Sequence, residues 1–172
     1  MSAMTRRHAV VHTELGDLTM IADGPALAAV YFPHHWHLPP ESDYGDPVSA
    51  DDEVFAQTAR ELDEYVAGER REFDVEITTA GDEFSERVWA LLREIPYGTT
   101  TTYGELARRL GNPRLAQRVG QCVGRNPISV IVPCHRVIGA DGSLTGYAGG
   151  LDRKRRLLEI EEPPEAAEAR LF

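Results

Sequence analysis

Residues 128–136 read ISVIVPCHR, and the interpretation of the chain starts from this stretch. The apolar run at 128–132 predicts a buried strand, which leads through a proline into Cys134 and His135. A strand that ends in this way can present a thiol at the mouth of a pocket, and a neighbouring histidine can raise the fraction of reactive thiolate. Because an isolated Cys-His pair is more often a buried cysteine beside a surface histidine, the surrounding sequence has to decide.

The chain of 172 residues suits one large domain or two small ones, and a hydrophobic content of 42% can fill a core. No apolar run approaches the ~20 residues of a membrane span, and no signal peptide is recognisable, so we expect a cytoplasmic protein without a membrane segment. Cys122 and Cys134 lack metal-ligand spacing and should be free thiols. The cluster His34, His35 and His37 has no second ligand group, so no metal site is expected.

The net charge of −10 is unevenly distributed along the chain. Residues 1–81 hold five basic and 16 acidic side chains, net −11, whereas residues 82–160 hold 12 basic and eight acidic ones, net +4. Residues 161–172 carry net −3. Because DNA affinity depends on local contacts with phosphates, the basic part permits a DNA-binding face without requiring one.

Residues 1–80 predict a small domain with a β-sheet and a helix. The predicted elements, in chain order, are strands at 9–13, 18–22 and 28–32, a helix at 53–67 and a strand at 73–77. A hairpin turn is expected at Gly16 and Asp17. The helix has the clearest pattern, because one face at helical spacing holds Val54, Thr58, Leu62, Tyr65 and Val66.

Residues 82–161 predict a mainly helical domain, followed by an acidic tail at 162–172. Its elements are an apolar helical stripe over 84–95, a short helix opened by the capping box at Thr102 and Glu105, a helix that stops at Asn126, and a helix over 151–161. The short helix, a turn with glycine and the next helix form a helix-turn-helix pattern, although most such patterns are only packed helices. The glycine-rich stretch 142–150 either admits a ligand close to the backbone or is an ordinary loop.

Taken together, these segments resemble the O6-alkylguanine-DNA alkyltransferases, a family of direct-reversal DNA repair proteins. The match spans about residues 82–161, and its ordered motifs are IPYG at 95–98, TYGELA at 102–107, VG at 119–120, NP at 126–127, PCHRVIG at 133–139 and GYAGGL at 146–151. The resemblance implies an α+β fold. In it, a ribonuclease H-like N-terminal α/β domain at 1–80 precedes a mainly helical, catalytic and DNA-binding domain at 82–161 with a short strand that bears the reactive cysteine.

The resemblance also implies a mechanism, in which the Cys134 thiolate takes the alkyl group from O6-alkylguanine and keeps it, so that each molecule acts once. His135 corresponds to the base that receives the thiol proton through a water, and Glu161 to the carboxylate that orients the histidine. Asn126 corresponds to the residue that holds the local turn at the pocket, whereas Arg136 is expected to form structural ion pairs. O4-alkylthymine is a further expected substrate, and no cofactor or metal is required.

Members of this family bind double-stranded DNA through the minor groove and flip the lesion out of the stack. The thin helix surface that such binding needs is expected at Gly120 and Cys122, and Tyr103 corresponds to a tyrosine that presses on the phosphate of the target nucleotide. The expected pocket residues are Tyr103, Tyr147, Ala148, Gly149, Ser129 and Val137. The expected DNA-binding residues are Thr102, Tyr103, Gln117, Arg118, Gly120, Cys122 and Arg125. The protein is expected to be a monomer, and cooperative assembly on DNA is left open.

The chain departs from the family on the recognition helix. Gln117 stands where the family usually has an arginine that fills the space of the flipped base, and the arginine here is Arg118. A shift of one residue turns a side chain by about 100° on a helix. Gln117 therefore either fills the gap itself or leaves flipping less efficient. Ser129 replaces the bulkier proline of some relatives, which predicts a different tolerance for large alkyl groups.

Three other functions compete with repair. A lesion-binding module that only flags damage is disfavoured by Cys134, because relatives of that kind typically carry a tryptophan there. A regulator triggered by alkylation would need a separate partner, since the chain has no cysteine-rich metal-binding extension. A generic cysteine hydrolase would have to turn over, and the helix-turn-helix and the loop motifs disfavour it.

Overall fold

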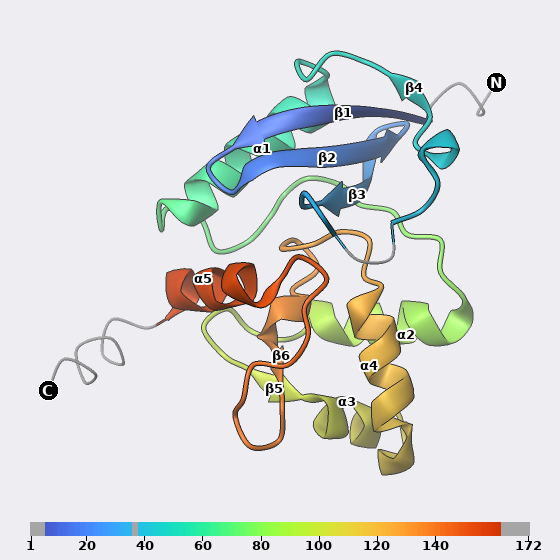
Figure 1. Ribbon diagram of the computed structural model, residues 1–172, viewed down its shortest axis with the longest axis vertical. Coiled ribbons are helices and arrows are strands. Elements are labelled where there is room, and N and C mark those ends of the chain that lie inside the picture. Colours follow the sequence, from blue (N-terminus) through green and yellow to red (C-terminus); the bar gives the residue numbers. More distant parts are fainter. Residues whose placement is uncertain (1–5, 36–37, 163–172) are drawn as a thin grey trace, which may run out of the picture.

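The computed structural model describes residues 6–35 and 38–162, and these residues form an α+β fold in two parts (Figure 1). In chain order the elements are β1 (Arg6–Thr13), β2 (Gly16–Asp23), β3 (Ala26–Tyr31), η2 (Glu41–Asp43), β4 (Asp46–Pro47), α1 (Glu53–Val66), α2 (Glu83–Arg93), β5 (Thr101–Thr102), α3 (Tyr103–Arg109), η3 (Pro113–Leu115), α4 (Ala116–Gly124), η4 (Cys134–Arg136), β6 (Val137–Ile138) and α5 (Leu151–Glu161). The predicted α+β class is confirmed. No helix in these two ranges has the length and apolar character needed to cross a membrane.

The N-terminal part is a four-stranded sheet in the order β3-β2-β1-β4 with α1 packed on one face (Figure 1). β1 and β2 pair antiparallel from Arg6–Asp23 to Thr13–Gly16, so the hairpin turn is formed by Glu14 and Leu15, two residues before its predicted place. Alternate residues of β1 are buried, which is the pattern of a sheet with one face on the core.

Helix α1 has nearly the predicted bounds, because its start and its buried face are both encoded locally. The Asp52 side chain accepts a hydrogen bond from the Val54 amide and caps the first turn. The buried face presents Phe55, Leu62 and Tyr65 to the sheet and to the C-terminal part. The helix thereby carries a tyrosine of the N-terminal part into the interior of the molecule.

The strand predicted at 73–77 is wrong: the segment is irregular, and its backbone pairs with β3 through an isolated bridge between Leu27 and Ile77. The buried carboxylate of Glu61 on α1 explains the difference. Its Oε1 accepts hydrogen bonds from the backbone amides of Asp74, at 2.8 Å, and Val75, at 3.2 Å. Because a side chain satisfies these donors, the segment does not need a partner strand there.

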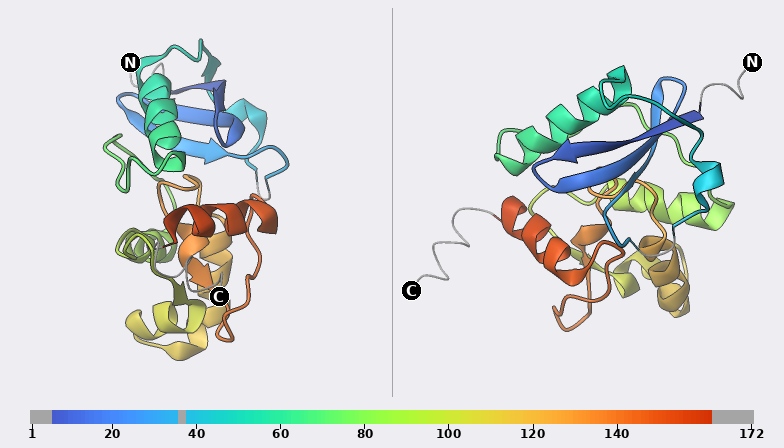
Figure 2. Two further views of the ribbon diagram at one scale, coloured as in Figure 1. Left: turned by 90° about the vertical axis from the view of Figure 1, so that its left-hand side faces the viewer. Right: turned by 45° about the horizontal axis from the view of Figure 1, so that its top comes forward.

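The C-terminal part is mainly helical, and α3, η3 and α4 lie at the end of the molecule away from the sheet (Figure 2). The hydroxyl of Thr102 accepts a hydrogen bond from the Glu105 amide at 3.1 Å, so the predicted cap of α3 is present. The Glu105 carboxylate pairs with Arg108. Helix α4 packs against α2, where the Trp89 indole donates to the backbone carbonyl of Cys122.

The strand predicted at 128–132 is also wrong, because these residues form a buried turn that leads into η4. Val130 has a φ of +73°, and the Val132 amide bonds to the carbonyl of Ile128 at 3.0 Å. The apolar character of the run matches its burial, because Ile128, Val130 and Val132 are each at most 1% exposed. Cys134 therefore begins a 3-10 turn and is not borne by a strand. A bridge between Val30 and Ile128 joins this turn to β3 and so to the N-terminal sheet.

Candidate active site

The turn that holds Cys134 is closed by the side chain of Asn126. The Asn126 amide nitrogen donates to the carbonyl of Val132 at 2.7 Å, and its oxygen accepts from the Ile128 amide at 3.0 Å. Cys134 follows directly and is only 6% exposed. Burial raises the pKa of the Cys134 thiol, an effect that Asn126 and the positive charge of Lys154 partly oppose. A resting thiol in this site is protonated and needs a base.

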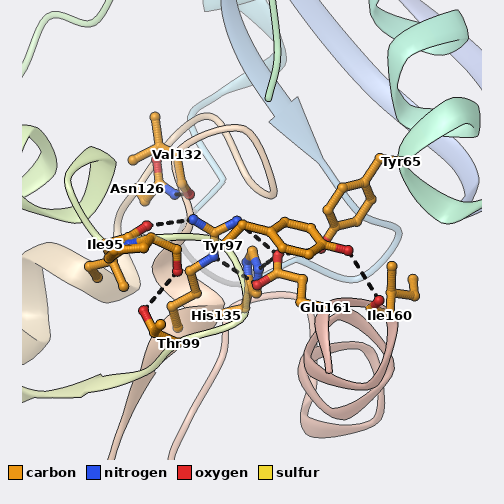
Figure 3. A network of polar contacts seen from close by, with 11 residues as sticks. Tyr65, Ile95, Tyr97, Thr99, Asn126, Val132, His135, Ile160 and Glu161 are labelled. Carbon is orange, nitrogen blue, oxygen red and sulfur yellow. Dashed lines mark hydrogen bonds and ion pairs between the residues drawn. The ribbon is translucent and has the colours of Figure 1, made fainter. Parts of the chain in front are cut away.

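The residue after the thiol belongs to a fully buried network of polar side chains (Figure 3). His135 Nε2 lies 2.6 Å from Glu161 Oε2, a distance typical of a charge-assisted hydrogen bond. Two nitrogens of Arg136 donate hydrogen bonds to the same carboxylate, at 2.8 and 3.0 Å. A third nitrogen donates to the Ile95 carbonyl at 2.6 Å. The hydroxyl of Tyr65 donates to Glu161 Oε2 at 2.5 Å. The ion pair expected of Arg136 is present.

This network determines which nitrogen of His135 can act as a base. Burial by itself would raise the pKa of Glu161, but hydrogen bonds from His135, Arg136 and Tyr65 outweigh it and lower that pKa to about 2. Burial lowers the pKa of His135, and Arg136 already balances the carboxylate, so the imidazole is neutral. Since the ionised carboxylate accepts at Nε2, the proton resides there, and the buried Nδ1, which has no partner among the described side chains, keeps a free lone pair.

A buried lysine stands close to the thiol. Lys154 is 0% exposed, and its Nζ donates to the carbonyl of Thr145 at 3.0 Å. Burial lowers the pKa of Lys154 to about 8, whereas a negative charge on Cys134 would raise it. Tyr147, also buried, lies beside the thiol, and burial raises its pKa. The site can therefore place a positive charge near a thiolate.

A cavity of about 760 Å³ opens between α4, the first residue of α3 and the glycine-rich loop. Tyr103 lies at its edge, where its hydroxyl is 2.8 Å from the hydroxyl of Thr145 and its ring lies against Gly120. Five of the residues expected at the pocket or on DNA line this cavity: Tyr103, Gln117, Gly120, Arg125 and Ala148. Two of the expected residues, Asn126 and Tyr147, lie beside the Cys134 thiol, His135 follows it in the chain, and Glu161 is reached through His135.

Other expected pocket residues have packing roles in this structure. Gly149 does not line the cavity, and a Cβ there would lie 2.5 Å from the Phe32 ring and 2.9 Å from the Tyr147 ring. Ser129 is 1% exposed within the turn, and Val137 is fully buried in β6. The Thr102 hydroxyl is engaged in capping α3.

Two of the residues expected to bind DNA, Arg118 and Cys122, face α2 instead. The Arg118 guanidinium stacks on Phe84 of α2, 3.9 Å from the ring centroid. Cys122 Sγ is 3.4 Å from the Ser85 hydroxyl, also on α2. Because two helical positions differ by about 200°, Gly120 faces the cavity while Cys122 faces the opposite neighbour. The thin surface expected at Gly120 and Cys122 is therefore not shared by Cys122.

Sequence reasoning missed two residues of this site. Tyr65 was interpreted only as a core residue of a helix, because its partner Glu161 is 96 residues away in the chain. Lys154 belongs to a run of four basic residues, 153–156, which is typical of a solvated helix face. Its spacing from Leu157 and Glu161 was the available signal, since the three residues share the buried face of α5.

The described residues contain no group of three or more potential metal ligands. In the histidine cluster, His35 Nδ1 accepts a hydrogen bond from the Phe32 amide at 3.3 Å. His37 lies outside the described residues. Both cysteines are free thiols.

Two family models match the chain, the "6-O-methylguanine DNA methyltransferase, ribonuclease-like domain" over residues 7–79 and the "6-O-methylguanine DNA methyltransferase, DNA binding domain" over residues 83–163. A methylated-DNA–protein-cysteine methyltransferase of Methanosarcina acetivorans is 44% identical over 154 residues, which are 90% of this chain and 97% of that protein. This chain belongs to the 6-O-methylguanine DNA methyltransferase family. A relative of the same name from Mycobacterium bovis is 43% identical over 162 residues, 94% of this chain and 96% of that protein.

Solved structures of the methyltransferase family support the assignment. The structure of Mycobacterium tuberculosis OGT in complex with DNA matches with a TM-score of 0.81 and 40% identity, covering 93% of this chain and 97% of that chain. An O6-methylguanine DNA methyltransferase from Methanococcus jannaschii matches with a TM-score of 0.60 and 31% identity, over 84% and 87% of the two chains. Cys134, His135 and the helices α3 and α4 all lie within the range of the family's DNA-binding domain.

Proposed function

We propose that this protein is a single-use DNA repair methyltransferase that moves the alkyl group from O6 of guanine in double-stranded DNA to Sγ of Cys134. The observation that carries the proposal is a buried thiol next to a neutral histidine whose free Nδ1 is opposite its carboxylate bond. The curated relatives are named for transfer of methyl groups from DNA to a protein cysteine. O4-alkylthymine offers the same kind of alkyl–oxygen bond and is the second proposed substrate.

The chemistry is one displacement. His135 Nδ1 receives the thiol proton through a water, and the thiolate attacks the alkyl carbon. The carbon–oxygen bond breaks, and its electron pair moves into the purine ring. The purine takes up a proton and leaves as neutral guanine. The gain of that proton balances the loss from Cys134. A thioether cannot be hydrolysed under these conditions, so the protein is consumed and no cofactor takes part.

Charges around the thiol favour this displacement. When the proton leaves, the imidazolium of His135 is stabilised by Glu161, as in a nucleophile–base–carboxylate triad. The buried ammonium of Lys154 stabilises the thiolate. The Glu161 carboxylate and the Lys154 ammonium both lie on the buried face of α5, which holds them in place before the substrate arrives.

We propose that α3 and α4 enter the minor groove and that the flipped base enters through the 760 Å³ cavity, whose lining residues Gly146 and Ala148 flank Tyr147, the neighbour of the Cys134 thiol. Gly120 keeps the surface of α4 thin, and Tyr103 at the cavity edge presses on the phosphate of the target nucleotide. Gln117 of α4 also lines the cavity, which supports its role in filling the space that the flipped base leaves in the duplex. Arg118 is engaged by Phe84 and takes no part in that step.

The proposal assigns two domains, a ribonuclease H-like one at 1–80 and the catalytic one at 82–161. It places the protein in a reducing compartment such as the cytoplasm, because only a reduced Cys134 can react. One Cys134 accepts one alkyl group, so a monomer is sufficient for repair. Cooperative assembly along DNA would change the affinity and not this stoichiometry.

A titration of active protein against a duplex with one O6-methylguanine tests the proposal. The number of repaired lesions should equal the number of protein molecules and then stop rising. Cys134→Ala should repair none while still binding the lesion duplex. Repair of several lesions per molecule, or repair by Cys134→Ala, would refute the single-use mechanism.

A further inference from the structure

Tyr65 connects the N-terminal part of the protein to the active site. It lies on α1, yet its hydroxyl donates to Glu161 Oε2 at 2.5 Å (Figure 3). Tyr65 is 0% exposed and Glu161 is 2% exposed, so water does not compete for this bond. Burial raises the pKa of Tyr65 far above its usual range, and the hydroxyl therefore remains a donor at every pH at which the protein works.

The contact is held by packing on both sides. The Tyr65 ring meets Tyr97 edge-on, with centroids 6.3 Å apart, and meets Phe73 at 5.5 Å. The Arg136 guanidinium lies over the Tyr97 ring, 5.7 Å from its centroid. Glu161 Oε2 accepts three donors, from Tyr65, His135 and Arg136, and their directions together fix the plane of the carboxylate.

We propose that Tyr65 is a positioning residue for alkyl transfer, acting through Glu161 on the base His135. The inference rests on the function proposed above. It gives the N-terminal part a role in the reaction, because that part supplies one of the three donors that hold the carboxylate. Alkyl transfer by the C-terminal domain then depends on how α1 is docked.

The hydroxyl affects both the geometry and the charge of the network. While Tyr65 shares the negative charge of Glu161, less of it acts on the imidazole, and His135 stays neutral. The groups that face this pair are Tyr65 of α1, Tyr97 of the segment after α2, Arg136 of η4 and Lys154 of α5. Without the hydroxyl, the carboxylate charge acts more strongly on His135 and raises its pKa. Protonation then removes the base at a higher pH than in the natural protein.

Tyr65→Phe tests this inference, because it removes the oxygen and keeps the ring. We would measure the second-order rate of methyl transfer between about pH 5 and pH 9, the range in which histidines titrate. We expect a rate about tenfold lower at neutral pH. This is the effect of losing one hydrogen bond to a charged group when the remaining donors compensate for part of the loss. The acidic limb of the profile should move to higher pH.

The matched control is Tyr97→Phe, which also removes one hydroxyl next to the network. That hydroxyl donates to the Ile160 carbonyl at 3.2 Å and not to the carboxylate, so the pH profile should keep its natural position. Thermal unfolding and lesion affinity, the latter in a Cys134→Ala background, separate folding from positioning. In a Glu161→Gln background, Tyr65→Phe should add almost nothing to the loss of rate, since coupled residues are not additive.

The inference is overturned if Tyr65→Phe keeps the natural rate and profile, or if its rate falls equally at every pH together with stability or affinity. Full additivity with Glu161→Gln also overturns it. These results differ from failure of the proposed function, in which the natural protein itself takes no methyl group from the duplex. A shifted acidic limb with unchanged affinity, absent from Tyr97→Phe, supports it.

Discussion

Arg136→Met should strongly destabilise the protein, because it leaves Glu161 buried without its principal cation. Two nitrogens of Arg136 contact the carboxylate at 2.8 and 3.0 Å, and Glu161 is 2% exposed. Removing one partner of a buried pair typically costs about 3–5 kcal/mol. Methionine retains most of the apolar stem, so the change removes the charge together with the hydrogen bond to the Ile95 carbonyl.

The titration of Glu161 gives an independent magnitude. Burial alone would raise its pKa, but its three donors hold it at about 2, against an ordinary value of 4.5. The free-energy equivalent of that difference is about 3 kcal/mol. Because the folded pKa is the lower one, this stability is present above about pH 4.5 and is lost as the pH falls towards 2. Both magnitudes are a large part of a typical domain's stability.

Urea unfolding at neutral pH, repeated at several pH values down to about 3, measures both effects. The variant should lose about 3–5 kcal/mol at neutral pH and should lose less stability than the natural protein on acidification. Arg155→Met is the control, because this arginine of α5 is 56% exposed and pairs with an exposed Asp152, and no measurable change is expected. A loss below about 1 kcal/mol for Arg136→Met, comparable to a surface pair, would refute the assigned role.

Three further predictions concern single residues. Gln117→Arg should tighten binding of a lesion duplex or raise the repair rate, and an unchanged or weaker binding isotherm would count against its assigned place in the DNA stack. Gly149→Ala should destabilise the protein by about 1–3 kcal/mol, because the new Cβ meets the rings of Phe32 and Tyr147. In chemical denaturation the control Gly124→Ala, where nothing lies within 4 Å, should show little effect. Equal losses of stability in the two variants would contradict the packing. Lys154→Met should move the pH dependence of Cys134 alkylation by iodoacetamide to higher pH, because the thiolate loses its cation; an unmoved profile would show that Lys154 does not stabilise it.

The helices could be predicted from the sequence because their signals are local. Asp52 and Thr102 cap the first turns of α1 and α3 through hydrogen bonds to nearby backbone amides. The bounds of α5 match the predicted 151–161. Of the two wrong strands, the apolar run at 128–132 is buried as predicted, whereas 73–77 alternates apolar and acidic residues and only its Val75 is buried. Their backbone donors and acceptors are satisfied by the side chains of Glu61 and Asn126, and hydrophobic pattern alone carries no information on that choice.

The active site was predictable only in part. The residues themselves pointed to Cys134 and His135 as neighbours, while Glu161 was assigned through the resemblance. Tyr65 and Lys154 could not be assigned, because each acquires its role from a contact across the fold. A tyrosine on an apolar helix face and a lysine in a basic run have ordinary explanations until the tertiary structure places them.

Intact-protein mass spectrometry with peptide mapping tests the central claim most directly. After incubation with a duplex that contains O6-methylguanine, the account predicts the addition of one methyl group per molecule, located on Cys134 and absent from Cys134→Ala. A methyl group on another residue, or an unchanged mass while the duplex is bound, would contradict the account.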